Sequence, residues 1–81
     1  MLDQKQILEY AIKGISKDIE DLDFQVRKGG KMIDSYYKGE TLKTKLPIHE
    51  IERVCREKRA EIEKLEKEKD DLKWALSELE E

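Results

Sequence analysis

Apolar residues in the first half of the chain recur every three or four positions, with charged and polar residues between them. The steps between them are 4, 3, 4, 3, 4 and 7, and Gly29 stands at the one vacant place. Such a heptad repeat predicts a helix with a single apolar stripe, which is typical of a coiled coil. The stripe comprises Leu8, Ile12, Ile15, Ile19, Leu22, Val26 and Ile33.

The second half of the chain has the same rhythm, with Lys58 and Lys69 at its two vacant places. Pro47 precedes the repeat and suits the first turn of a helix, where its missing amide hydrogen has no partner to lose. These features predict a second helix over about residues 47–79. Its stripe comprises Ile48, Ile51, Cys55, Ile62, Leu65, Leu72, Leu76 and Leu79.

The end of the first helix is ambiguous in the sequence. Two consecutive glycines, Gly29 and Gly30, each cost a helix interior about 1 kcal/mol and suggest a stop. However, Ile33 keeps the repeat in phase, and Lys38-Gly39 is a better C-terminal signal. We therefore expect a helix over about residues 3–37 with a kink at 29–30, and a turn over about residues 39–46. A helix that stops at the glycine pair is the alternative.

Two helices of similar length predict an all-α, antiparallel two-helix hairpin that resembles a coiled coil and forms one domain over residues 1–81. This arrangement places Gly29 opposite the part of the second helix that runs from Cys55 to Lys58. The aliphatic stem of Lys58 could cover the space that the missing side chain of Gly29 leaves. Two apolar stripes bury too little surface to offset the conformational entropy lost on folding. We therefore expect hairpins to assemble into a helical bundle as a homo-oligomer.

Several apolar side chains flank the two stripes and are candidates for an interface. Ile7, Tyr10 and Ala11 lie near the open end of the hairpin, together with Trp74, whereas Val54 lies near the turn. Trp and Tyr often dominate protein interfaces, so Trp74 with Tyr10 and Ile7 could bind a protein partner. Alternatively, Trp74 covers the bundle core within the same oligomer.

Charge is unevenly distributed along the chain, although charged residues make up 46% of it and the net charge is only −3. Residues 27–45 carry six basic and two acidic groups between two acidic segments. Cations beside tyrosines can hold a small anion such as a nucleotide, although plain solubility and packing also explain them. The acidic segments argue against binding of duplex nucleic acid. The candidate ligand residues are Arg27, Lys28, Lys31, Tyr36, Tyr37, Lys38, Lys43 and Lys45.

The residues offer little for catalysis. His49 and Cys55 are the only His and Cys, and a spacing of six puts them on roughly opposite sides of a helix. We therefore expect no enzymatic activity, no metal and no cofactor. With a single Cys, no signal peptide and no stretch long enough to span a membrane, the sequence favours a reducing, cytoplasmic location.

The sequence thus predicts a non-catalytic, oligomeric helical hairpin that binds copies of itself and a protein partner. The alternative is a protein that sequesters a small ligand, a nucleotide or cyclic nucleotide signal, near the turn. In size and architecture alone, the chain resembles small accessory proteins of phages and mobile elements. That resemblance implies binding and inhibition of a host protein, or assembly of hairpins around a cyclic nucleotide.

Overall fold

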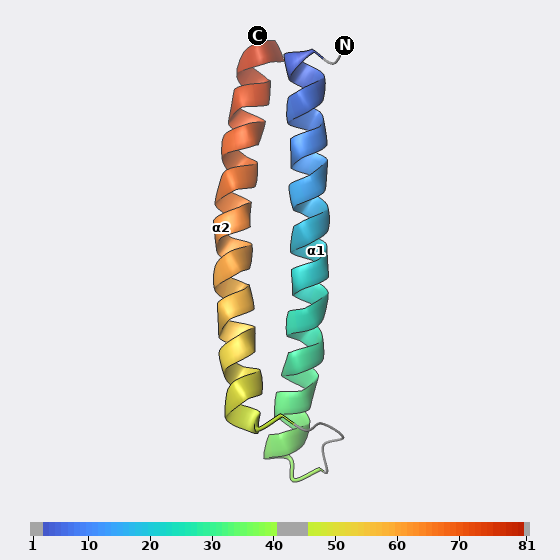
Figure 1. Ribbon diagram of the computed structural model, residues 1–81, viewed down its shortest axis with the longest axis vertical. Coiled ribbons are helices and arrows are strands. Elements are labelled where there is room, and N and C mark those ends of the chain that lie inside the picture. Colours follow the sequence, from blue (N-terminus) through green and yellow to red (C-terminus); the bar gives the residue numbers. More distant parts are fainter. Residues whose placement is uncertain (1–2, 41–45, 81) are drawn as a thin grey trace.

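A computed structural model describes residues 3–40 and 46–80, which form two long helices; the expected turn over about residues 39–46 lies mostly outside the described residues. Helix α1 spans Gln4–Tyr37 and helix α2 spans Ile48–Glu80. The helices run antiparallel and side by side along their whole length, so the start of α1 and the end of α2 lie together at one end of the hairpin (Figure 1). The described residues contain no strand. The predicted all-α two-helix hairpin is therefore confirmed.

Helix α1 begins with a reciprocal capping box. The Gln6 backbone N–H donates to Oδ1 of Asp3 at 2.8 Å, and the Asp3 backbone N–H donates to Oε1 of Gln6 at 3.2 Å. Each bond satisfies a backbone donor that has no partner within the helix. The sequence analysis did not identify this pair, which fixes the start of α1 within one residue of the expected position.

Helix α1 passes through Gly29 and Gly30 without interruption and ends after Tyr37. The Gly39 N–H donates to the Tyr36 carbonyl at 3.0 Å, and the Glu40 N–H donates to the Ser35 carbonyl at 2.9 Å. Gly39 has a φ of +81°. This combination is the Schellman motif, which requires a left-handed residue immediately after the helix and therefore favours glycine there.

Pro47 caps the start of α2. Its carbonyl accepts the backbone N–H of Glu50 at 3.0 Å and of Ile51 at 3.2 Å, so Pro47 lies one residue before the helix and not in its first turn. Either place suits proline, because the amide nitrogens at a helix start have no intrahelical acceptor. Arg53 binds the carboxylates of Glu50 and Glu57 on the same helix, and its guanidinium lowers the pKa of the Glu50 carboxyl group.

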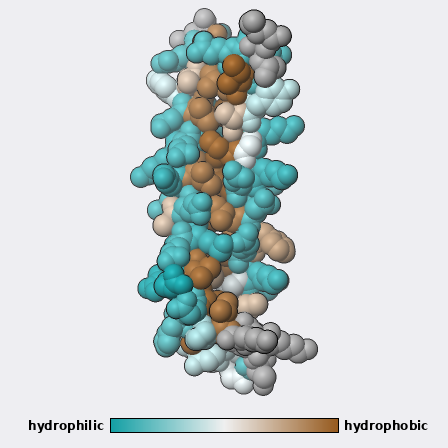
Figure 2. All heavy atoms as spheres, viewed as in Figure 1, coloured by the Kyte–Doolittle hydropathy of each residue, from teal (hydrophilic) through white to brown (hydrophobic). Residues whose placement is uncertain are grey.

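The hairpin is a rod with extents of 56 × 20 × 15 Å and a thin core. The described side chains that are buried lie in the half nearer the turn; they are Val26, Ile48, Ile51 and Cys55. The remaining stripe residues are half-buried, and Leu79 is exposed. Figure 2 accordingly shows a hydrophobic band along the seam between the helices, open to solvent on the face in view. One hairpin therefore covers its two stripes only in part.

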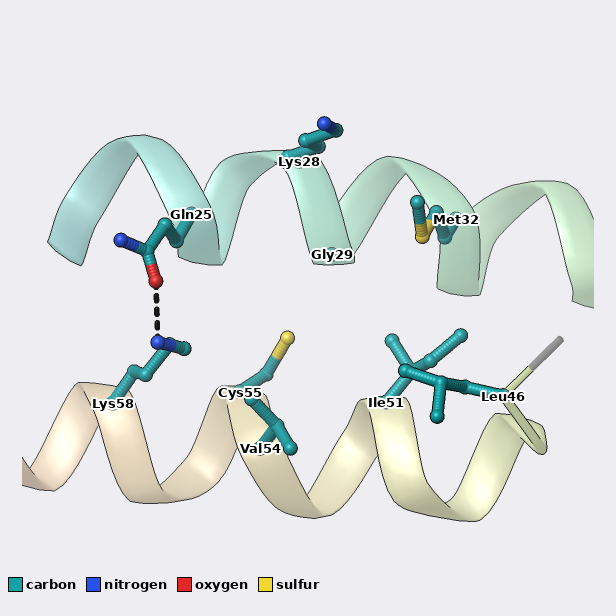
Figure 3. A pocket seen from close by; sticks show the side chains of 9 residues that line it. All are labelled: Gln25, Lys28, Gly29, Met32, Leu46, Ile51, Val54, Cys55 and Lys58. Atoms are coloured by element: carbon teal, nitrogen blue, oxygen red, sulfur yellow. Dashed lines mark hydrogen bonds between the residues drawn. The ribbon is translucent and has the colours of Figure 1, made fainter. Parts of the chain in front are cut away.

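Gly29 lies in close contact with the facing helix. It faces Cys55, as the sequence predicted, and the Cys55 side chain points across the seam toward it (Figure 3). A Cβ atom on Gly29 would collide with Sγ of Cys55 and lie 3.8 Å from Cγ2 of Ile51. The vacant place in the first stripe is therefore filled by the thiol of the facing helix, which is only 4% exposed.

We predict that Gly29→Ala destabilises the hairpin. Alanine gains about 1 kcal/mol of helix propensity over glycine, but overpacking a close contact costs about 1–3 kcal/mol. The net loss in the free energy of unfolding should therefore lie between about 0 and 2 kcal/mol, measured by urea unfolding followed by circular dichroism at one fixed protein concentration.

Gly30→Ala is the matched control, because nothing lies within 4 Å of the added Cβ atom. This substitution should raise the free energy of unfolding by about 1 kcal/mol. Adding Cys55→Ala should make Gly29→Ala better tolerated, because the colliding sulfur is then gone. An equal gain in stability from Gly29→Ala and Gly30→Ala would show that no such contact exists.

Candidate functional site

The two sides of the seam between the helices differ in polarity. On one side a hollow of about 170 Å³ opens near the turn. Its wall comprises Gln25, Lys28, Gly29, Met32, Leu46, Ile51, Val54, Cys55 and Lys58. We call this side the apolar face, which at helical spacing also includes Ala11 of α1 and Ala75 of α2. On both helices this face contains residues that directly precede a stripe residue: Gln25 precedes Val26 on α1, and Val54 precedes Cys55 on α2.

The opposite side, the polar face, is bordered mainly by charged groups. Its hollow is lined by Gly30, Ile33, Asp34, Glu52, Cys55, Arg56 and Arg59. Removing the water around charged side chains costs free energy, so this side is poorly suited to burial in an interface. The apolar face is the better candidate for an interaction surface.

Lys58 borders the hollow of the apolar face without filling it. Its ammonium group donates to Oε1 of Gln25 across the seam, as Figure 3 shows. The sequence predicted that the Lys58 stem could cover the gap at Gly29, and the structure places Lys58 on the wall of the hollow beside that glycine. The side chain is half-buried, with its amine tied to the other helix.

A second hollow adjoins the first on the apolar face, because Gln25 borders both. It lies farther from the turn, and three carboxylates surround its two leucines. Its wall comprises Asp18, Asp21, Leu22, Gln25, Glu61 and Leu65. The apolar face thus carries cations near the turn and carboxylates toward the middle of the rod.

On the polar face, a tyrosine links the two helices near the turn. The Tyr37 hydroxyl donates to Oε1 of Glu52 at 3.1 Å. This hydrogen bond and the carboxylate charge raise the pKa of Tyr37, because ionisation would remove the donor and place two negative charges together. The Tyr36 ring packs edge-on against Tyr37, with centroids 5.3 Å apart.

The candidate interface residues do not form one group. Val54 borders the hollow of the apolar face, and Ala11 is half-buried on the same side. Ile7 is exposed at the open end. Tyr10, 62% exposed, borders hollows lined only by α1 residues, and Trp74, 71% exposed, falls on the outward side of α2 at helical spacing. The structure therefore does not bring Tyr10 and Trp74 together.

The candidate ligand residues also diverge. Arg27 pairs with Asp23 of its own helix at 2.9 Å, whereas Lys28 borders the apolar hollow. Lys31 and Lys38 are exposed and, at a spacing of seven, lie on the side of α1 that faces away from α2. Lys43 and Lys45 lie outside the described residues. The described candidate cations, Arg27, Lys28, Lys31 and Lys38, thus do not converge on one pocket within a single hairpin.

The sequence analysis missed two features of this surface. One is the group of carboxylates on the apolar face, Asp18, Asp21 and Glu61, which comes together only once the register between the helices is known. The other is Phe24, which is 68% exposed on the outward side of α1. The heptad repeat could have revealed Phe24, because it occupies the same outward position as Tyr10, fourteen residues earlier.

No arrangement typical of catalysis or metal binding is present in the described residues. His49 is exposed at the start of α2, and Cys55 is buried in the seam. Residues 3–40 and 46–80 contain no group of three or more His, Cys, Asp or Glu side chains that could hold a metal ion. Neither described helix combines the length and hydropathy needed to cross a membrane.

Comparisons with known proteins give this chain no relative. No protein-family model, no curated protein sequence and no solved structure matches it. The function must therefore be argued from the surface itself.

We predict that Glu52→Gln lowers the pKa of Tyr37 toward that of a free tyrosine. Glutamine can still accept the hydrogen bond, but it lacks the negative charge that opposes ionisation. The measurement is an alkaline titration of Tyr37 by NMR. Glu66→Gln, at an exposed position away from Tyr37, is the control and should leave this titration unchanged. Identical titrations in the Glu52→Gln variant and the parent would contradict the contact.

Proposed function

We propose that this chain is a non-catalytic interaction protein that self-associates through its apolar face and binds a protein partner through its outer surfaces. The observation that carries the proposal is the incomplete burial of the two apolar stripes. Other copies of the chain supply the missing helices, giving a bundle in which each stripe has more than one neighbour.

The surface area supports association. The chain exposes 6766 Å², whereas a compact monomer of 9.6 kDa exposes roughly 5,100 Å². The excess is roughly 1,700 Å², and an interface of standard size buries about 800 Å² on each partner. One hairpin therefore has enough surplus surface to form such an interface and still expose the rest of its rod.

A partner protein has other surfaces available. Tyr10, Phe24 and Trp74 are all more than 60% exposed and face away from the seam, so self-association through the apolar face leaves them uncovered. Exposed aromatic side chains contribute disproportionately to binding energy at protein interfaces. No described feature favours the nucleotide-sequestering alternative, because the candidate cations do not gather around one pocket.

Sedimentation equilibrium over a micromolar concentration range tests the proposal. A mass of at least two chains, in a sample whose circular dichroism is that of a long helix, is the expected result. A fully helical monomer throughout that range would overturn the proposal, because the stripes would then be stable without a neighbour.

We predict that Val54→Asp weakens self-association by at least about tenfold, because it places a charge on the hollow of the apolar face. Ala60→Asp on the outward side of α2 is the control and should leave the association constant within about twofold. Both substitutions are read by sedimentation with helicity checked in parallel. The control loses more helix propensity than Val54→Asp, so weaker association only in the Val54 variant must come from the surface.

A further inference from the structure

Positive and negative side chains on the apolar face lie at different heights along the rod, so they could determine how a second copy binds there. Lys28 and Lys58 border the hollow nearer the turn, and Asp21 and Glu61 border the hollow nearer the middle. Gln25 borders both hollows and so marks the boundary between the cations and the carboxylates. Among the residues that border these two hollows, the cations therefore lie on one side of Gln25 and the carboxylates, which include Asp18, lie on the other.

We propose that the second copy lies antiparallel across the apolar face, with a two-fold axis passing near Gln25. The basic pair, Lys28 and Lys58, of each copy then meets the acidic pair, Asp21 and Glu61, of the other. This arrangement rests on the proposed function, since it specifies how the self-associated hairpins face each other. Such an interface is isologous, so each contact occurs twice.

Distances along the rod support the position of this axis. Lys28 lies three residues after Gln25 and Asp21 lies four residues before it, which is about 4.5 Å and 6 Å along the helix. A two-fold axis that is perpendicular to the rod at the level of Gln25 moves each group of the second copy to the other side of that level. The lysines of one copy then lie at about the same height along the rod as the carboxylates of the other copy.

The second helix follows the same arrangement. The contact between Gly29 and Cys55 sets the register of α2, so Lys58 lies about level with residue 26 and Glu61 about level with residue 23. The hydrogen bond from Lys58 to Gln25 agrees with this register. Lys58 and Glu61 thus fall on opposite sides of the axis at nearly equal distances, as the pair on α1 does.

The other direction of packing is disfavoured by the same charges. If two copies lay parallel with their turns together, Lys28 would face Lys28 and Asp21 would face Asp21. Bringing like charges together at an interface costs free energy. The free energy that this repulsion costs the parallel pair is larger than the free energy that opposite charges contribute to the antiparallel pair. The polarity of the apolar face therefore selects the antiparallel pair.

Two double charge reversals test the arrangement in the full chain. Lys28→Glu with Lys58→Glu makes both patches acidic, and Asp21→Lys with Glu61→Lys makes both basic. In an antiparallel pair each variant alone opposes like charges, so its dissociation constant should rise at least about tenfold. An equimolar mixture of the two variants restores opposite charges at both contacts and should associate about as tightly as the parent chain.

Matched reversals on outward positions serve as controls. Lys31→Glu with Lys67→Glu, and Glu20→Lys with Glu63→Lys, change the net charge by the same amounts on exposed residues away from the apolar face. Neither should change the dissociation constant more than about twofold. Because Lys58 is half-buried, the single substitutions Lys28→Glu and Asp21→Lys repeat the test if circular dichroism shows that a double variant is unfolded.

Each result has a distinct meaning. Weakened variants whose mixture regains parental affinity support the antiparallel pair. Variants that each associate like the parent overturn it while self-association stands, and a mixture tighter than the parent then indicates the parallel direction. A parent chain that is monomeric overturns this arrangement together with the proposed function.

Discussion

A helix that packs against only one neighbour cannot bury an apolar stripe as wide as those of this chain, and the rest of the structure follows from this constraint. A stripe at heptad spacing presents two rows of side chains, and one facing helix covers their inner edges. The buried residues lie near the turn, where Gly29 allows the helices to approach and Cys55 fills the space. Elsewhere the rows stay half-buried, and a second layer would improve their burial.

The heptad repeats predicted the hairpin, its antiparallel direction and the position of Gly29 opposite the helical turn that runs from Cys55 to Lys58, where the structure has Cys55 facing it. These features depend on spacing alone, which a single sequence displays directly. The helix ends depend on individual hydrogen bonds, so the capping box of Asp3 and Gln6 was missed and Pro47 was placed one residue too far into α2. Whether α1 continues through Gly29 and Gly30 depends on the balance between the low helix propensity of glycine and the packing of the residues around it. The spacing of apolar residues does not show which of the two is larger.

The surface was harder to predict, because it depends on the angle of each residue around its helix and on the register between the helices. Tyr10 and Trp74 were grouped since both lie near the open end, but each faces outward from its own helix. Two residues at the same height along the rod can therefore still point to different sides of it. Likewise, the basic residues of segment 27–45 are close in sequence, yet Arg27, Lys28 and Lys31 point in different directions from α1.

Register also explains why charge on this surface can carry specificity that composition conceals. Asp21 and Glu61 are forty residues apart and border the same hollow because of the register between the helices, in which Gly29 faces Cys55. Lys58 occupies a stripe position where an aliphatic side chain would add more burial. A polar residue there lowers the affinity of any apolar pairing but favours one direction over the other. In the proposed antiparallel pair Lys58 would determine the orientation of the two copies, and its bond to Gln25 ties the ammonium group to the facing helix.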